Sequence, residues 1–180
     1  MIDPARSRRL VGQAAYVGIG LTILVVALLP LSPGRVGWPG PDLLVALTLA
    51  WVLRRPEQVP VAVIAALALT ADVLLMRPIG LGAAIMVAGS EAARLREHRW
   101  RAQGFLVEWL RVGVLMGAMV LADRVLRTIL AVPQTLAPMP PLGQDLLRLI
   151  ATAAAYPLVV WVARTLAGLR RAAPGETEPG

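Results

Sequence analysis

The apolar residues of this chain gather in six runs, which are separated by segments rich in proline and arginine. A helix rises about 1.5 Å per residue, so about 20 apolar residues cross a hydrocarbon core of about 30 Å. The runs and their flanks predict helices over about residues 10–31, 42–53, 59–76, 79–95, 105–132 and 145–169. A final segment, residues 172–180, is rich in Pro, Gly and Glu, and we expect it to be a disordered tail after a single transmembrane domain, residues 1–171.

The third and fourth predicted helices are joined by a tight break at Arg77-Pro78, and each is close to the lower length limit for a span. Two interpretations follow. Both helices cross the membrane, or together they form a buried re-entrant hairpin. We prefer about six spans, because an odd number would place one end of the chain outside.

Arginine is distributed unevenly over the two predicted sides. With the N-terminus inside, the cytoplasmic segments hold twelve arginines, the opposite side holds two, and four lie within helices. The positive-inside rule therefore predicts a multi-pass membrane protein with both termini in the cytoplasm. The five tryptophans would then form interfacial belts, at Trp38 on the outer side and Trp51, Trp100, Trp109 and Trp161 on the inner side.

Composition agrees with a membrane protein. Hydrophobic residues make up 57% of the 180 residues, mean hydropathy is +0.68, and a soluble chain of this size could not bury so much apolar surface. The net charge of +7 comes from arginines between apolar runs rather than on one basic face, so we expect no nucleic-acid binding. The lack of cysteine and the single histidine, His98, exclude thiolate and multi-histidine metal sites. We expect neither a metal nor a cofactor.

Asp72 is a candidate functional residue, because it falls near the outer end of the third helix. A carboxylate there must face protein or water, and Arg77 is its expected partner across the turn. The structural interpretation is an ion pair or a cap on the N-terminus of the fourth helix. The functional one is a site for a partner or an ion, and we favour the structural one.

A second polar cluster lies near the end of the fifth helix. Asp123 and Arg127 are four residues apart and can neutralise each other on one face. Arg124 points elsewhere, so it needs a partner from a neighbouring helix, a second protein or a lipid headgroup. Snorkelling of these side chains to the outer interface is an equally good explanation.

Three further features concern packing. Glu108 and Arg111 are three residues apart, and we expect a surface pair at the headgroups. Gly113 and Gly117 form a small-residue face that admits another helix. Pro157 falls within the sixth helix, where it should cause a kink and free a backbone carbonyl.

Catalysis finds little support in the sequence. The serines Ser7, Ser32 and Ser90 have only His98 as a possible base, and it lies in a basic loop. Neither paired carboxylates on one helix face nor a glycine-rich phosphate loop is present. We therefore expect a protein that is not an enzyme, and a lipid-modifying enzyme is the weakest hypothesis.

Several short motifs, in this order, resemble the rod shape-determining protein MreD family over about residues 41–169. They are Gly40-Pro41-Asp42-Leu43-Leu44, Trp51-x-Leu53-x-x-Pro56-Glu57-x-Val59, Asp72-x-Leu74, Pro78-Ile79-Gly80, and Tyr156-Pro157 followed by Arg164. One departure concerns the third helix, where family members often have glycines and this chain has Ala65, Ala66 and Ala68.

The resemblance implies an all-α integral membrane fold of six helices, similar to the substrate-binding components of energy-coupling-factor transporters. It also implies a place in the bacterial inner (cytoplasmic) membrane and a non-catalytic role in the cell-elongation machinery. The implied partners are MreC, RodA, a class B penicillin-binding protein and, indirectly, MreB filaments. The hypothesis is a scaffold that binds the single-span helix of MreC. Its candidate contacts are the Gly113/Gly117 face and the Asp72/Arg77 turn.

The alternative hypothesis, suggested by the implied fold, is a small-molecule (vitamin-type) binding component of an uptake transporter. Such a protein should present converging polar and aromatic groups in an outward cavity. The predicted outer loops instead carry mostly proline and aliphatic residues. The scaffold hypothesis is therefore preferred.

Overall fold

The computed structural model describes residues 4–29, 39–96, 104–130 and 139–166, and these form six α-helices, one 3-10 helix and no strand. The helices are α1 (Pro4–Leu28), α2 (Leu43–Val52), η1 (Pro56–Gln58), α3 (Val61–Leu74), α4 (Leu81–Arg94), α6 (Phe105–Ile129) and α7 (Leu142–Leu166). Each α-helix lies in a region where the sequence predicted one. The predicted tail, His98, Trp38 and Trp100 lie outside the described residues.

The α-helices fall into two length classes. Three are long and apolar enough to cross a membrane: Arg6–Leu28, Phe105–Ile129 and Leu142–Thr165. By contrast, α2 has 10 residues and α3 and α4 have 14 each. At about 1.5 Å per residue these three extend about 15–21 Å, less than a hydrocarbon core of about 30 Å. The chain is thus an all-helical protein with three candidate spans.

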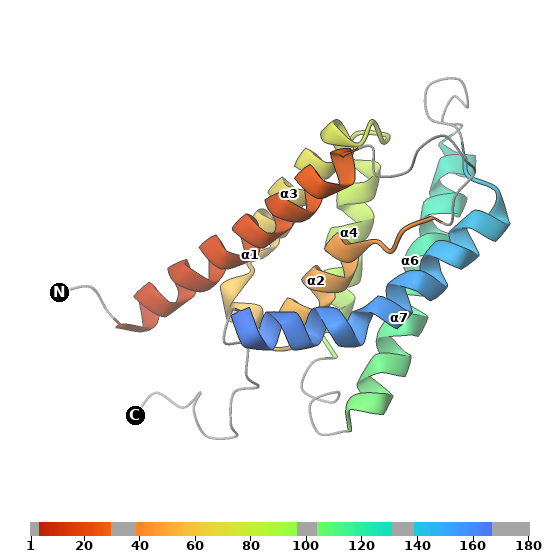
Figure 1. Ribbon diagram of the computed structural model, residues 1–180. Helices are drawn as coiled ribbons and strands as arrows, with labels where there is room; N and C mark the ends of the chain where they lie inside the picture. The colour runs from red at the N-terminus through yellow and green to blue at the C-terminus, as the bar shows by residue number, and fades with distance from the viewer. Residues whose placement is uncertain (1–3, 30–38, 97–103, 131–138, 167–180) are drawn as a thin grey trace.

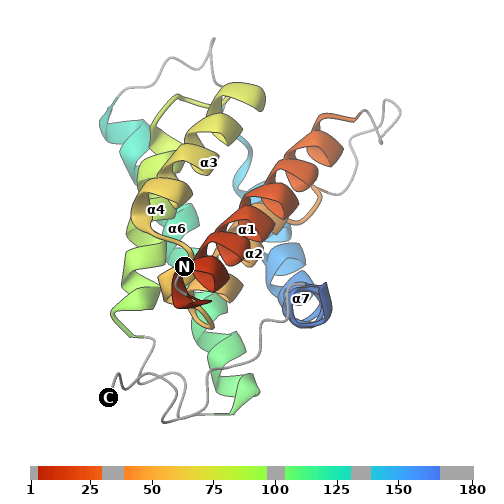
Figure 2. The same cartoon turned by 90° about the vertical axis from the view of Figure 1, so that its left-hand side faces the viewer.

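The helices run alternately up and down the molecule (Figure 1). The start of α1, the α2–α3 connection, the end of α4, the start of α6 and the end of α7 lie toward the bottom. The end of α1, the α3–α4 turn, the end of α6 and the start of α7 lie toward the top. Figure 2, turned about the vertical axis, keeps these heights. We call these the lower end and the upper end.

Helix α2 forms the centre of the bundle, where α1, α4, α7 and η1 contact it. Eight of its ten residues are buried, and its one polar side chain is satisfied locally: the Thr48 hydroxyl bonds the Leu44 carbonyl at 2.8 Å and the Tyr16 hydroxyl at 2.9 Å. The interfacial position predicted for Trp51 is wrong. Its ring is fully buried edge-on against Tyr16 (5.6 Å), and its indole N–H donates to Gln58 at 3.1 Å.

Proline and glycine set the ends of the short helices. Pro60 immediately precedes α3, where its missing N–H costs nothing. Gly80 precedes α4 with φ of 87°, a left-handed conformation that other residues adopt with difficulty. This turn explains why α4 begins at Leu81, two residues later than predicted.

Two glycines that the sequence analysis did not single out allow helices to approach closely. A Cβ at Gly20 of α1 would meet the Leu67 side chain of α3 at 2.5 Å, and one at Gly89 of α4 would meet Met119 of α6 at 2.6 Å. The packing expected at Gly113 and Gly117 is weaker. A Cβ at Gly117 would lie 3.6 Å from Leu149, which is ordinary contact, and one at Gly113 would meet nothing within 4 Å.

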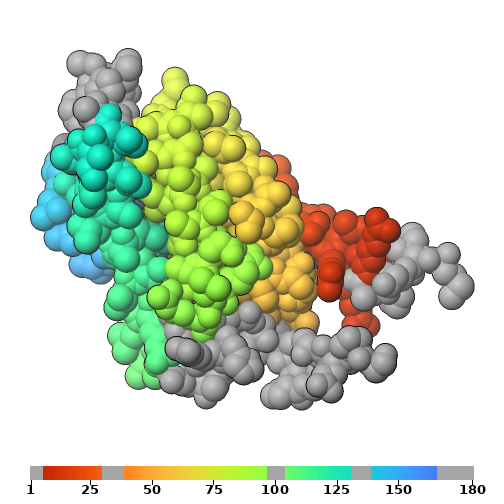
Figure 3. Space-filling view, turned by 180° about the vertical axis from the view of Figure 1, so that it is seen from behind, coloured from red at the N-terminus to blue at the C-terminus, as the bar shows by residue number. Residues whose placement is uncertain are grey.

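Seen from behind, α3, α4 and α6 lie side by side as a continuous wall (Figure 3). Large apolar side chains are exposed on the long helices, which is what lipid or a partner helix would cover in a membrane. On α6 they include Leu106, Leu110, Val114, Leu121, Val125 and Ile129.

Candidate functional site: paired polar groups inside and at the upper end of the bundle

Asp72, at the end of α3, caps the N-terminus of α4. Its Oδ2 accepts hydrogen bonds from the backbone N–H groups of Gly80 and Ala83, both at 3.0 Å, and the residue is 1% exposed. The carboxylate also lies directly against Gly82, where a Cβ would collide with it. The negative charge thus satisfies donors that α4 leaves open and complements the positive end of its dipole. The cap favoured by the sequence is confirmed.

The ion pair expected between Asp72 and Arg77 is wrong, because Arg77 pairs with a different carboxylate. Its Nη2 lies 3.5 Å from Oδ2 of Asp42, which also caps α2 by accepting from the Val45 N–H at 3.2 Å. The Asp42 N–H in turn donates to the Thr152 hydroxyl at 2.8 Å. Asp42 therefore connects the α3–α4 turn and the start of α2 to α7.

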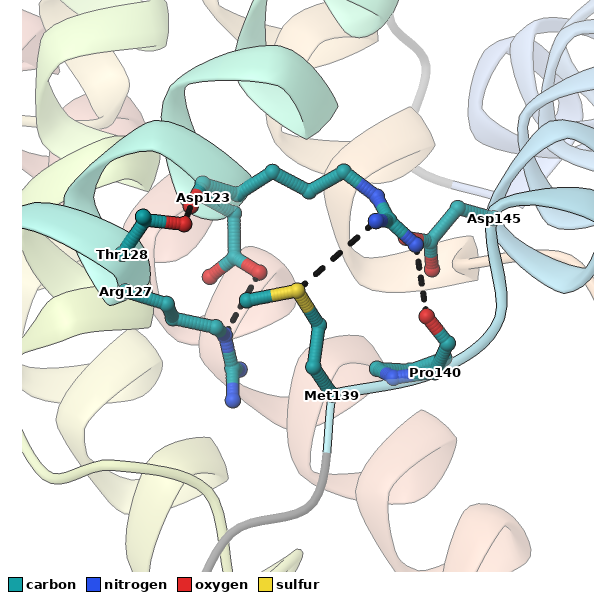
Figure 4. Close-up of polar contacts among 7 residues, drawn as sticks. Asp123, Arg127, Thr128, Met139, Pro140 and Asp145 are labelled. Carbon is teal, nitrogen blue, oxygen red and sulfur yellow. Dashed lines mark hydrogen bonds and ion pairs between the residues drawn. The ribbon is translucent and has the colours of Figure 1, made fainter. Parts of the chain in front are cut away.

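A second group at the upper end joins α6 to the start of α7 (Figure 4). Arg127 Nε lies 2.7 Å from Asp123 Oδ2, which confirms the expected i,i+4 pair. Arg124 finds its partner on the neighbouring helix, with Nε 2.7 Å from Asp145 Oδ2 and Nη2 donating to the Pro140 carbonyl at 2.5 Å. The sequence left three possible partners for Arg124, and the structure shows that the partner is a neighbouring helix, α7.

The most deeply buried polar group lies nearer the lower end, between α2, α6 and α7. The Arg54 guanidinium is 2.8 Å from Glu108 Oε1, and the Tyr156 hydroxyl donates to the same oxygen at 2.9 Å. Arg54 Nη1 also donates to the Ala50 carbonyl at 3.0 Å. We call Arg54, Glu108 and Tyr156 the buried triad.

The position expected for Glu108 is therefore wrong: it is 3% exposed and not a headgroup-level surface residue. The error has a physical cause. A carboxylate near the start of a long apolar helix resembles an interfacial charge unless the folded partner is known, and Arg54 is 54 residues distant in sequence.

Arg94 fixes the α2–α3 connection to the end of α4. Its guanidinium donates to the carbonyls of Pro56 and Val59, each at 2.7 Å, and its Nε pairs with Glu91 at 2.8 Å. These carbonyls belong to the Pro56-Glu57-x-Val59 motif. The motif thus forms the turn between α2 and α3, and the guanidinium of Arg94 from α4 holds this turn in place.

Pro157 lies within α7, as expected, and the carbonyl that it frees has a partner. Proline has no N–H for the carbonyl four residues earlier, which is Ala153. The Trp109 indole of α6 donates to this carbonyl at 2.7 Å. Helix α7 changes direction along its length in Figure 1, as a proline in mid-helix predicts.

The remaining predicted site residues are not gathered into one site. Arg164 is exposed in the last turn of α7, where a cation complements the negative end of the helix dipole. Gly80 serves the α3–α4 turn. The Gly113 position faces open space half-way along α6.

Three residues of these clusters were not singled out by sequence reasoning: Arg54, Asp145 and Tyr156 as a hydrogen-bonding group. Tyr156 had a signal, since a tyrosine hydroxyl in an apolar helix needs a polar partner. Arg54 is one of the twelve arginines that the positive-inside count assigns to the cytoplasmic segments. Because Arg54 is completely buried, it does not belong among the arginines that face lipid headgroups.

No protein-family model, no curated protein and no solved structure matches this chain. The geometry must therefore carry the functional argument.

That geometry is one of internal neutralisation. Among the described residues, no group of three or more His, Cys, Asp or Glu side chains could hold a metal ion. The carboxylates of Asp42, Glu108, Asp123 and Asp145 each lie beside an arginine, and that of Asp72 beside two backbone donors. Such groups hold helices in place and leave the apolar outer faces for contact with lipid or protein.

Proposed function

We propose that this chain is a non-catalytic membrane subunit of the bacterial cell-elongation complex, a scaffold of the MreD type. In this proposal it lies in the inner membrane with both termini in the cytoplasm, and its six helices cross or enter the bilayer in the manner of an energy-coupling-factor substrate-binding component. It binds MreC and helps to couple MreC to RodA and its class B penicillin-binding protein, with MreB filaments reached indirectly.

One observation carries the proposal: four residues of the MreD-like motifs lie in the core of the bundle or hold its helices together. Asp42 caps α2 and pairs with Arg77, Trp51 lies in the core, Asp72 caps α4, and Tyr156 belongs to the buried triad. Motif residues that are far apart in sequence thus stabilise the same helical bundle. A chain whose buried polar groups are used for internal packing suits a scaffold better than a catalyst.

The Asp72/Arg77 turn is unsuited to bind MreC, because Asp72 is buried and caps α4. The surviving candidate is the face around Gly113 of α6. Gly113 is half-buried with nothing within 4 Å of a Cβ position, and exposed Val114 (74%) lies beside it. In lipid, small residues promote association because they let helix backbones approach, so this position can accept a single helix.

Co-purification tests the proposal. The chain with an affinity tag is expressed together with the MreC of the same genome, and the complex is extracted in mild detergent. We expect MreC to be recovered with the chain, whereas an unrelated single-span protein expressed at the same level is not. Equal recovery of both proteins, or of neither, would contradict the proposal.

A second measurement on the same sample addresses the vitamin-binding alternative. Mass spectrometry of the purified chain should detect no stoichiometric small organic molecule. A bound vitamin-like ligand together with failure to recover MreC would replace the scaffold hypothesis with that of an uptake component.

A further inference from the structure

Arg148 of α7 differs from the other described arginines near the upper end. Arg77, Arg124 and Arg127 each lie beside a carboxylate, that of Asp42, Asp145 and Asp123 respectively. Arg148 is exposed, and within the described part of the chain its guanidinium has no hydrogen bond or ion pair. Its backbone carbonyl, not its side chain, accepts the Thr152 hydroxyl.

The position of Arg148 along α7 sets its depth. It follows Leu142, the first residue of the helix, by six positions, which is about 9 Å at 1.5 Å per residue. A cation at that depth in a membrane is costly unless an anion meets it. A long arginine side chain can snorkel toward the interface, so the anion that it reaches lies at the level of the lipid phosphates.

The residues that follow Arg148 along the same side of α7 are apolar. Positions 144, 148, 151, 155, 158 and 162 follow helical spacing and lie on one stripe of α7. Gln144 and Arg148 are exposed at its upper part, Ala151 and Ala155 are half-buried below them, and the exposed Leu158 follows. Two polar side chains therefore lie above a column of two alanines that ends at Leu158. A phosphate and an acyl chain have this same order along the membrane normal.

We propose that this stripe is a binding site for an anionic phospholipid, with the phosphate at Arg148 and Gln144 and one acyl chain along Ala151 and Ala155. The inference rests on α7 crossing a membrane and is independent of MreC. The guanidinium supplies charge and paired N–H donors, which suit a phosphate better than a neutral headgroup does.

Native mass spectrometry of the purified full chain, titrated with phosphatidylglycerol or phosphatidylcholine, tests the proposal. We expect the wild type to favour phosphatidylglycerol by about fivefold, the effect of roughly one arginine near a membrane surface. Arg148→Gln should abolish this preference, whereas Arg148→Lys should keep most of it. Ala155→Leu, which fills the column without altering charge, should lower binding of phosphatidylglycerol.

Arg164→Gln is the matched control, because Arg164 is an exposed arginine on the same helix at the opposite end. It should leave the preference unchanged. An equal loss in Arg164→Gln and Arg148→Gln would overturn the proposal in favour of diffuse attraction. So would displacement of the lipid by millimolar inorganic phosphate, which would identify a free-anion site. If the stripe binds a protein helix instead of a lipid, all variants should bind phosphatidylglycerol as the wild type does, and this result would also overturn the proposal.

Discussion

The buried triad and the charged pairs at the upper end use the same residue types in different surroundings. Arg54 and Glu108 have side chains that are 0% and 4% exposed, whereas those of Arg77 and Asp42 are 30% and 20% exposed. Breaking a fully desolvated pair leaves a charge without solvent or partner, while a partly exposed group regains water. We therefore expect the buried triad to stabilise the fold and the upper pairs to adjust the positions of helix ends.

The shortest helix explains why a buried triad is needed. Helix α2 has only 10 residues, and its last turn and Arg54 are buried nearer the lower end of the bundle. Arg54 donates back to Ala50 and forward to Glu108 of α6, which gives the helix end a donor and the cation a counter-ion. The long helices α1, α6 and α7 have no such need, because each is long enough to place its ends at an interface.

The largest expected effect comes from breaking the buried triad. Glu108→Gln should reduce the free energy of unfolding by about 3–5 kcal/mol, because Arg54 keeps its charge and loses its counter-ion. Reversible unfolding in mixed detergent–SDS micelles, followed by tryptophan fluorescence, measures this change.

Two variants control that result. Arg54→Met combined with Glu108→Leu should recover most of the loss, because it removes both charges. Glu57→Gln changes a half-exposed acid that is 3.7 Å from Arg55, and it should cost less than about 1 kcal/mol. If Glu108→Gln were as mild as Glu57→Gln, the distinction between buried and exposed ion pairs would fail.

Removing the cap of α4 should have the next largest effect. Asp72→Ala leaves the N–H groups of Gly80 and Ala83 without their acceptor, and loss of such a cap costs about 1–2 kcal/mol. The same unfolding assay measures it, and Asp72→Asn, which keeps an acceptor oxygen, should lose less. Equal losses in both variants would show that the cap depends on charge alone.

The bond between Trp109 and the carbonyl freed by Pro157 should contribute about 1 kcal/mol. A double-mutant cycle isolates it. Trp109→Phe should destabilise the wild type, but less so in a Pro157→Ala background, where the new N–H can bond Ala153. Identical costs of Trp109→Phe in the two backgrounds would refute the coupling.

The smallest effect is expected at the upper end. Arg127→Gln removes an i,i+4 pair and should cost about 0.3–0.5 kcal/mol. Arg124→Gln should cost more, because Arg124 also bonds the Pro140 carbonyl and links two helices. A loss for Arg127→Gln as large as that for Glu108→Gln would contradict the ranking of the two regions.

Periodic and local features were predictable from the sequence, whereas contacts between distant residues were not. The apolar runs predicted the helices, Pro157 the freed carbonyl, and the spacing of Asp123 and Arg127 their ion pair. Arg54 and Glu108, or Arg77 and Asp42, are joined only when the bundle closes. Their charges lie in short polar segments that resemble membrane interfaces, so sequence alone assigned them to lipid headgroups or to the wrong partner.

The glycines also show that local spacing is readable from the sequence, whereas contacts between helices are not. The spacing of Gly113 and Gly117 suggested close packing, yet the close approaches occur at Gly20 and Gly89, which have no such spacing. Whether a glycine is needed depends on the residue that faces it across the interface. Leu67 and Met119 face these two glycines, and neither could be identified before the helices were placed.

The most direct test of the scaffold proposal is the affinity of the chain for MreC in nanodiscs, measured by fluorescence energy transfer. Gly113→Leu fills an open position, so it should leave folding intact and weaken binding about tenfold or more. Val125→Leu, at an exposed position of the same helix about three turns away, should change the dissociation constant less than about twofold. No measurable affinity of the wild type, or equal affinities for all three proteins, would contradict the account.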